Sequence, residues 1–129
     1  MKYMLLIYMA DGAMNDAERE ACFQESAQLC HDLNAAGLYV AANPLHPTST
    51  ATSVRVRGGK PVVTDGPFAE TREHLGGYFL IDAPNLDEAI RIAARIPGAR
   101  KGTVEIRPVL EIPGLPTGSP AAATPGCGH

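Results

Sequence analysis

The side chains best suited to chemistry gather in one stretch of this chain, TDGPFAETREHLGG, at residues 64–77. Asp65 follows a predicted strand, and functional side chains are often placed where a strand runs into a loop. Glu70 and His74 lie four residues apart, so the carboxylate could act as a base or orient a histidine that transfers protons. Arg72 could hold an anionic substrate. Together these residue types predict a small-molecule site for cofactor-free acid–base chemistry, such as isomerisation, elimination or hydrolysis.

The same stretch also has a structural interpretation. Asp-Gly-Pro is by itself a common turn sequence, because Asp bonds to downstream amides, Gly adopts unusual φ values and Pro restricts its own φ. A Glu70–His74 pair is compatible with a short solvated helix. Gly76 and Gly77 are expected to allow a close backbone approach or a bulge before the next strand. Both interpretations stay open for Asp65.

His46, Arg55 and Phe68 complete the set of candidate residues. His46 lies in a proline-rich loop, NPLHPTST, and is the expected proton carrier if this loop and Asp65 share a pocket. Arg55 lies on a predicted hairpin strand, where it either binds an anion or protects the strand from edge pairing. Phe68 is a further ligand-binding candidate. The predicted catalytic residues are Asp65, His46, Glu70 and His74, and the predicted ligand-binding residues are Arg55, Arg72 and Phe68.

The elements that must position these residues follow from hydrophobic periodicity and from turn signals. Asn15 and Asn85 each precede a glutamate by three residues, a spacing typical of a helix-capping box. Gly58-Gly59 separates two strands of a hairpin. The predicted order is a strand at 2–9, a helix from 15 to about 36, a strand at 38–45, a hairpin at 51–64, a strand at 77–83, a helix at 86–96 and a strand at 103–112. This order predicts an α+β, ferredoxin-like βαββαβ sandwich with an inserted β-hairpin.

The buried faces of these elements are predicted from the same spacing. The first helix is expected to bury Phe23, Ala27, Cys30 and Leu33. The second helix is expected to bury Leu86, Ala89, Ile90, Ala93 and Ile96, and to stop at Pro97-Gly98. The last strand is expected to point Val104, Ile106, Leu110 and Ile112 inward.

The strands at 2–9 and 77–83 are apolar on both faces. Two helices can cover only one face of a four-stranded sheet, so the second face needs another cover. The simplest cover is the same sheet of a second copy. We therefore expect a homodimer.

Composition excludes several classes of function. A net charge of −3 and the absence of Trp argue against nucleic-acid binding. No apolar run is long enough for a membrane span, and the first nine residues read as a strand rather than a signal peptide. Three cysteines without paired spacing suit a reducing cytoplasm. No spacing of ligands predicts a metal site or a cofactor.

Residues 113–129, rich in Pro, Gly and Ala, are expected to form a flexible tail after a single domain at 1–112.

Three segments carry a resemblance to a known family: MKYMLLIY, ATSVRVRGGKPVVTDGPFAETREHLGGYFLIDAPNLDEAIRIAARIP and GTVEIRPV. They resemble the DGPF-motif family of the YCII-related group over roughly residues 1–112. This resemblance implies a ferredoxin-like fold that pairs into a dimeric α/β barrel, in cytoplasmic bacterial proteins of mostly unknown function. For the wider group it implies cofactor-free catalysis by a His and an Asp that meet in a cleft. Asp65 matches the acidic residue of the motif, whereas Arg72 and His74 stand where lysine and glutamine are commoner.

The resemblance also implies a second kind of function. Some relatives are encoded beside, or fused to, sigma factors of the extracytoplasmic-function type. The chain would then be a ligand-sensing or protein-docking module, with the DGPF loop in a structural role. The sequence leaves the enzyme and the regulatory module open.

Overall fold

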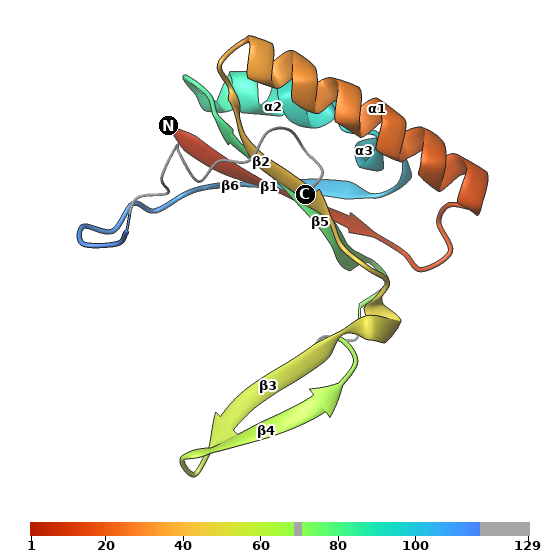
Figure 1. Ribbon diagram of the computed structural model, residues 1–129, viewed down its shortest axis with the longest axis vertical. Coiled ribbons are helices and arrows are strands. Elements are labelled where there is room, and N and C mark those ends of the chain that lie inside the picture. Colours follow the sequence, from red (N-terminus) through yellow and green to blue (C-terminus); the bar gives the residue numbers. More distant parts are fainter. Residues whose placement is uncertain (69–70, 117–129) are drawn as a thin grey trace.

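A computed structural model describes residues 1–68 and 71–116 (Figure 1). Glu70 and residues 117–129 of the predicted tail lie outside these residues. The four described tail residues, 113–116, are exposed.

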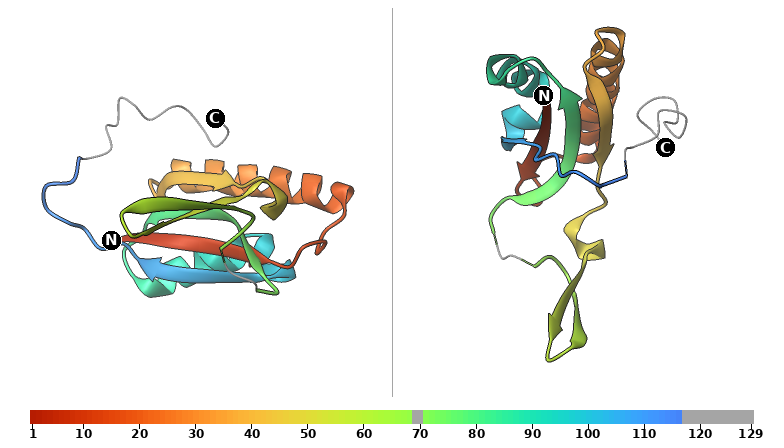
Figure 2. Two further views of the ribbon diagram at one scale, coloured as in Figure 1. Left: turned by 90° about the horizontal axis from the view of Figure 1, so that it is seen from below. Right: turned by 90° about the vertical axis from the view of Figure 1, so that its left-hand side faces the viewer.

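The body of the molecule is a four-stranded antiparallel sheet with helices on one face (Figures 1 and 2). The strand order is β2-β5-β1-β6. Its strands are β1 (Lys2–Met9), β2 (Tyr39–Pro44), β5 (His74–Asp82) and β6 (Thr103–Pro108), and the helices are α1 (Asp16–Ala35), α2 (Leu86–Arg95) and the short α3 (Gly98–Lys101). The predicted ferredoxin-like α+β fold is confirmed.

The hydrophobic core lies between the sheet and the helices. Alternate residues of β1 point into it, so Tyr3, Leu5 and Ile7 are buried. The helices contribute Leu29, Cys30, Leu33, Ala89, Ile92, Ala93 and Ile96. Burial of these apolar side chains is the main stabilising term for the fold.

The predicted start of α1 is confirmed in detail. The Asn15 side chain accepts a hydrogen bond from the Glu18 amide at 2.8 Å, and the Glu18 carboxylate accepts one from the Asn15 amide at 3.1 Å. At the start of α2 only half of this arrangement is present. Asn85 accepts from the Glu88 amide, but the Glu88 carboxylate binds Arg91 instead.

Several predicted buried positions are wrong. Phe23 is 44% exposed, because the face of α1 that contacts the sheet runs through Leu29 and Leu33. On α2, Leu86 and Ile90 are exposed and Ile92 is buried in their place. The second helix ends at Arg95, just before the predicted stop at Pro97-Gly98, and a separate short helix, α3, begins at Gly98. The last strand ends at Pro108, which leaves Leu110 and Ile112 exposed beyond it.

The predicted hairpin is confirmed and forms an arm that stands off the body. Its strands are β3 (Thr52–Arg57) and β4 (Lys60–Asp65), which pair only with each other. Gly58 and Gly59 both have positive φ, as the two-residue turn requires. Figures 1 and 2 show the arm projecting on the side of the sheet opposite the helices. It joins the body through the short helix η1 (Thr48–Thr50) and through the segment that leads to β5.

The second face of the sheet is not covered by the helices of residues 1–68 and 71–116 (Figure 1). Cross-strand register places Met4 opposite Leu80 and Leu6 opposite Tyr78 on this face. At its β6 edge the face becomes polar, with Glu105 opposite Leu6 and Arg107 opposite Met4. We call these six residues the open sheet face.

Candidate functional site

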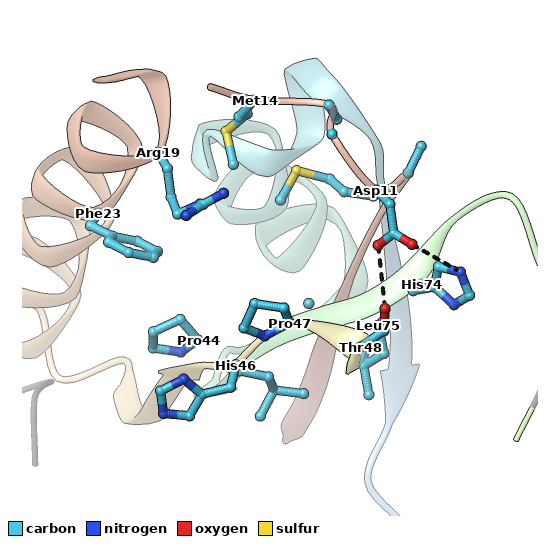
Figure 3. Close-up of a pocket in the computed structure, with 16 residues that line it drawn as sticks. Asp11, Met14, Arg19, Phe23, Pro44, His46, Pro47, Thr48, His74 and Leu75 are labelled. Atoms are coloured by element: carbon cyan, nitrogen blue, oxygen red, sulfur yellow. Dashed lines mark hydrogen bonds and ion pairs between the residues drawn. The ribbon is translucent and has the colours of Figure 1, made fainter. Parts of the chain in front are cut away.

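A cavity of about 460 Å³ lies where the arm joins the body (Figure 3). Its walls come from the end of β1 and the following loop, the first turns of α1, the segment from β2 into η1, and the start of β5. The cavity is lined by the polar side chains of Asp11, Arg19, His46, Thr48 and His74. Two predicted catalytic histidines therefore share one cavity, although they come from different parts of the chain.

A bulge in β5 determines where His74 lies. Ile7 pairs with Gly77 but Tyr8 pairs with Leu75, so Gly76 is an extra residue in β5. A shift of one residue moves the following side chains to the other face of a sheet. His74 therefore stands opposite Met9, and both line the cavity on the helix-covered side.

Both predictions for the glycine pair are confirmed. Gly76 forms the bulge, and Gly77 allows a close backbone approach. A Cβ atom on Gly77 would lie 3.0 Å from the carbonyl oxygen of Asn43 on the neighbouring strand. Gly76 thus sets the register of β5 on β1, and Gly77 lets β5 lie close to β2. The short solvated helix considered for residues 70–74 is wrong at its end, because His74 begins β5.

The side chains of His74 and Asp11 approach each other at the cavity wall, and they form an ion pair when the imidazole is protonated. Nε2 of His74 lies 3.8 Å from Oδ2 of Asp11, and the other carboxylate oxygen accepts a hydrogen bond from the Thr48 hydroxyl at 3.5 Å. Figure 3 shows both contacts as dashed lines. The His74 side chain is 17% exposed and the Asp11 side chain 73% exposed. A largely buried imidazole is thus held beside a carboxylate that solvent still reaches.

His46 is held in the cavity wall by the hydrogen bonds of its own loop. The Leu45 amide donates to the Gly76 carbonyl at 2.9 Å, which ties the loop to β5. The Thr50 amide and hydroxyl both donate to the Pro47 carbonyl, closing η1 just after His46. Hydrogen bonds therefore fix the loop between β2 and the arm on both sides of His46.

Arg19 and Phe23 form the opposite wall. They lie one turn apart on α1, and Figure 3 shows them across the cavity from Asp11 and His74. Arg19 has an ion pair with Asp16 at 3.5 Å, and the Asp16 side chain is almost fully exposed. A pair of this kind is weak, so the guanidinium can exchange partners.

A second, apolar chamber of about 320 Å³ adjoins the cavity beneath α1. Met9, Met14, Phe23, Pro44 and Gly76 line both spaces. The chamber is otherwise lined mainly by core side chains, among them Ile7, Cys30, Ala42, Phe79 and Ile96. The site thus combines a cavity that carries charged side chains with a more apolar chamber.

The structure places Asp65 outside this cavity. It is exposed at the end of β4, and its carboxylate makes no hydrogen bond or ion pair with the described part of the chain. The rest of its turn has a structural role. The Gly66 amide donates to the Ala51 carbonyl at 2.7 Å, and the Gly66 carbonyl accepts from the Ser53 hydroxyl at 2.8 Å. These bonds close the base of the arm.

Arg55 and Phe68 contact each other rather than the cavity. The Arg55 guanidinium carbon lies 4.6 Å from the centre of the Phe68 ring, which is 71% exposed. An exposed contact of this kind contributes about 0.5–1 kcal/mol. Arg72 is exposed in the segment before β5. The predicted catalytic Glu70 lies outside the described residues.

Three polar residues of the cavity, Asp11, Arg19 and Thr48, were not predicted from the sequence. Asp11 lies two residues after the end of β1, so the rule that strand ends carry functional side chains applied to it as well as to Asp65. Arg19 sits one turn into α1 and carried no signal of its own. Within the described residues no group of three or more His, Cys, Asp or Glu side chains is placed to hold a metal ion. Nor does this part of the chain contain a helix long and apolar enough to span a membrane.

The fold and the cavity define an α+β, ferredoxin-like domain with a histidine–carboxylate pair in a cleft. The family model of the YCII-related domain matches residues 1–113, and the chain belongs to this family. The chain is also similar to an uncharacterised protein of Rhizobium meliloti (strain 1021), with 36% identity over 118 residues. This match covers 84% of the chain and 92% of the relative. The predicted YCII-related resemblance is confirmed.

Proposed function

We propose that the chain binds a small molecule in the cavity and transfers protons on it without a cofactor. His74 is the proton carrier and Asp11 orients it. The observation that supports this proposal is the Asp11–His74 pair at the wall of a cavity, with the imidazole mostly withdrawn from solvent. Hydrogen bonds at such sites are often long in the absence of substrate, so 3.8 Å is compatible with a working pair.

The contact with Asp11 determines which nitrogen of His74 acts as the base. With Nε2 directed at Asp11, Nδ1 is the nitrogen that takes a proton from a carbon next to a carbonyl group. The products of that step are an enolate and an imidazolium, and the Asp11 carboxylate stabilises the new positive charge. Return of the proton to the same or another carbon completes an isomerisation. His46, on the loop below, is the second group that can exchange protons with the bound molecule.

Hydrogen–deuterium exchange tests this proposal. In D₂O, the wild-type protein should exchange the α-protons of one or more members of a panel of small enolisable ketones and 2-oxo acids, followed by proton NMR. His74→Gln should slow this exchange by about 10²- to 10⁴-fold, the usual contribution of a general base. His31→Gln, on the exposed side of α1, is the matched control and should exchange at the wild-type rate. Equal rates for His74→Gln and the wild type would contradict the proposal.

A second candidate function, protein docking, is favoured by the arm. Val54, Val56 and Val63 are each exposed, and cross-strand pairing places them on one face of β3 and β4 with Pro61. An apolar face on a projecting hairpin is typical of a protein interface. The partner predicted from the resemblance, a sigma factor, rests on that resemblance alone.

The homodimer is likewise our proposal, and the open sheet face supports it. In such a dimer the arm of one subunit could approach the other subunit. The ligand-binding roles predicted from the sequence for Arg55, Arg72 and Phe68, and the catalytic roles predicted for Asp65 and Glu70, stay predictions.

A further inference from the structure

Resting on the proposed function, we infer the chemical class of the ligand: a small amphipathic anion. Its carboxylate binds Arg19 at the mouth of the cavity. Its body, a single ring or a branched hydrocarbon, occupies the apolar chamber beneath α1. Three features of the described residues carry this inference.

The first feature is the chemistry of the chamber. Its walls are Met14, which precedes α1, residues of α1 between Cys22 and Cys30, among them Phe23 and Ser26, and residues of the sheet and of the segment after α2. The Asn43 side chain, which also reaches it, already donates a hydrogen bond to the Tyr78 hydroxyl at 2.9 Å. A water molecule there has few partners, so an apolar group displaces it favourably.

The second feature is continuity. Five residues line both the cavity and the chamber, so one molecule can occupy the two spaces together. Volumes of about 460 and 320 Å³ fall in the range of roughly 300–1,000 Å³ that is usual for small-molecule sites. A ligand with both polar and apolar parts uses the whole site, whereas a fully polar one leaves the chamber empty.

The third feature is charge. Among the residues that line the cavity, Arg19 supplies a permanent positive charge and Asp11 supplies a carboxylate. Asp11 is already engaged by His74 and Thr48, whereas Arg19 has only its weak pair with exposed Asp16. The group left to recognise a ligand charge is therefore the guanidinium, which favours a carboxylate.

Methionine-methyl NMR tests the inference with phenylacetate as the probe. The chain has four methionines, of which Met9 and Met14 line the chamber. Met1 and Met4 lie at the amino terminus and on the open sheet face. Phenylacetate should shift the methyl signals of Met9 and Met14 with a Kd of about 1 mM or tighter, and leave Met1 and Met4 unchanged. Acetate, which has the charge without the ring, and phenylacetamide, which has the ring without the charge, should each bind at least about 10-fold more weakly.

Variants separate this inference from the proposed function. Arg19→Gln should weaken phenylacetate binding by roughly 10- to 100-fold. Arg91→Gln on α2 removes a comparable exposed arginine, paired with an acid three residues away, and should bind normally. His74→Gln should also bind phenylacetate normally while losing proton exchange.

The inference is overturned if phenylacetate moves only Met4, moves neither Met9 nor Met14, or binds Arg19→Gln as well as the wild type. Equal affinity for phenylacetamide and phenylacetate would overturn the inference that the ligand is an anion. None of these outcomes bears on whether His74 transfers protons, which the exchange experiment decides by itself.

Discussion

Asp11 and Asp65 show at the residue scale how similar local sequences acquire different surroundings. Asp11 lies two residues after the end of β1, Asp65 is the last residue of β4, and each is followed by a glycine. Asp11 leaves a central strand of the body and meets His74 and Thr48 in the cavity. Asp65 leaves the second strand of the arm, where the nearest cross-strand partner is Thr52.

This difference predicts opposite effects of the same substitution. Asp11→Asn keeps the shape of the side chain but removes the charge that stabilises an imidazolium, so proton exchange should fall by about 10-fold or more. Asp65→Asn should leave both the exchange rate and the unfolding temperature unchanged. Rates measured by NMR, with thermal unfolding of both variants, check the prediction.

The reverse result would also be informative. If Asp65→Asn abolished exchange and Asp11→Asn did not, the DGPF motif would carry the chemistry. In that case a second copy would have to bring the arm to the cavity.

At the element scale, the joint between α3 and β6 depends on a glycine. Gly102 ends α3, and its amide donates to the Gly98 carbonyl at 2.8 Å. A Cβ atom at Gly102 would collide with the Tyr8 carbonyl oxygen and would lie 2.7 Å from Cγ of Met9. The backbone of β1, unlike a flexible side chain, cannot move aside.

Gly102→Ala should therefore lower the free energy of unfolding by about 1–3 kcal/mol or more. Gly76→Ala is the control, because its added Cβ would meet only ordinary contact at 3.8 Å from the Ile7 carbonyl oxygen. Urea unfolding measures both. Similar losses of stability in the two variants would contradict the prediction, because they would show that the backbone moves to relieve the clash at Gly102.

Ion pairs connect α1 to α3 and predict a pH dependence. A hydrogen bond from Lys101 lowers the pKa of Glu18, and one from Arg100 lowers the pKa of Glu25, both from the ordinary value of 4.5. A carboxyl whose pKa is lower in the folded state stabilises the fold above its ordinary pKa. That contribution is lost as the pH falls below about 4.5 and through the lowered values.

The wild type should therefore lose stability on acidification through this range, and the double variant Glu18→Gln/Glu25→Gln should lose less. The effect is small because both pairs are exposed. Glu20→Gln removes a charge from the same helix and is the control. Urea unfolding at neutral pH and at about pH 3.5 measures the difference. If the wild type and the double variant lost the same stability on acidification, these ion pairs would not be the source of the pH dependence.

At the scale of the whole molecule, the open sheet face and the arm lie on the same side, opposite the helices (Figure 2). The valines of the arm are exposed, and Met4, Leu6 and Leu80 of the open sheet face are half-buried. One symmetric contact that covers the open sheet face of two copies would bury them together.

Leu80→Lys tests this contact, because a charge at the centre of an apolar interface opposes association. In analytical ultracentrifugation at micromolar concentration, the wild type should sediment as a dimer and Leu80→Lys as a folded monomer. Ile90→Lys, at an exposed apolar position on α2, should remain a dimer. A monomeric wild type would contradict the proposed homodimer.

Local signals in the sequence determined much of the architecture. The cap at Asn15, the Gly58-Gly59 turn and the glycine pair of β5 each depend on neighbours close in the chain, and each prediction is confirmed. The exposed positions of Phe23, Leu86 and Ile90 were not predictable in this way. The orientation of a helix on a sheet depends on packing between distant segments.

The cavity was decided only by the tertiary structure. Asp11 follows the first strand and His74 begins the fifth, and their meeting requires β1 and β5 to be neighbours in the sheet. It also requires the bulge at Gly76, which turns His74 to the helix-covered side. The sequence by itself determined that histidines and carboxylates were present and that glycines would shape the start of β5. Which carboxylate meets which histidine is set by strand order and register, because these bring together residues that are far apart along the chain.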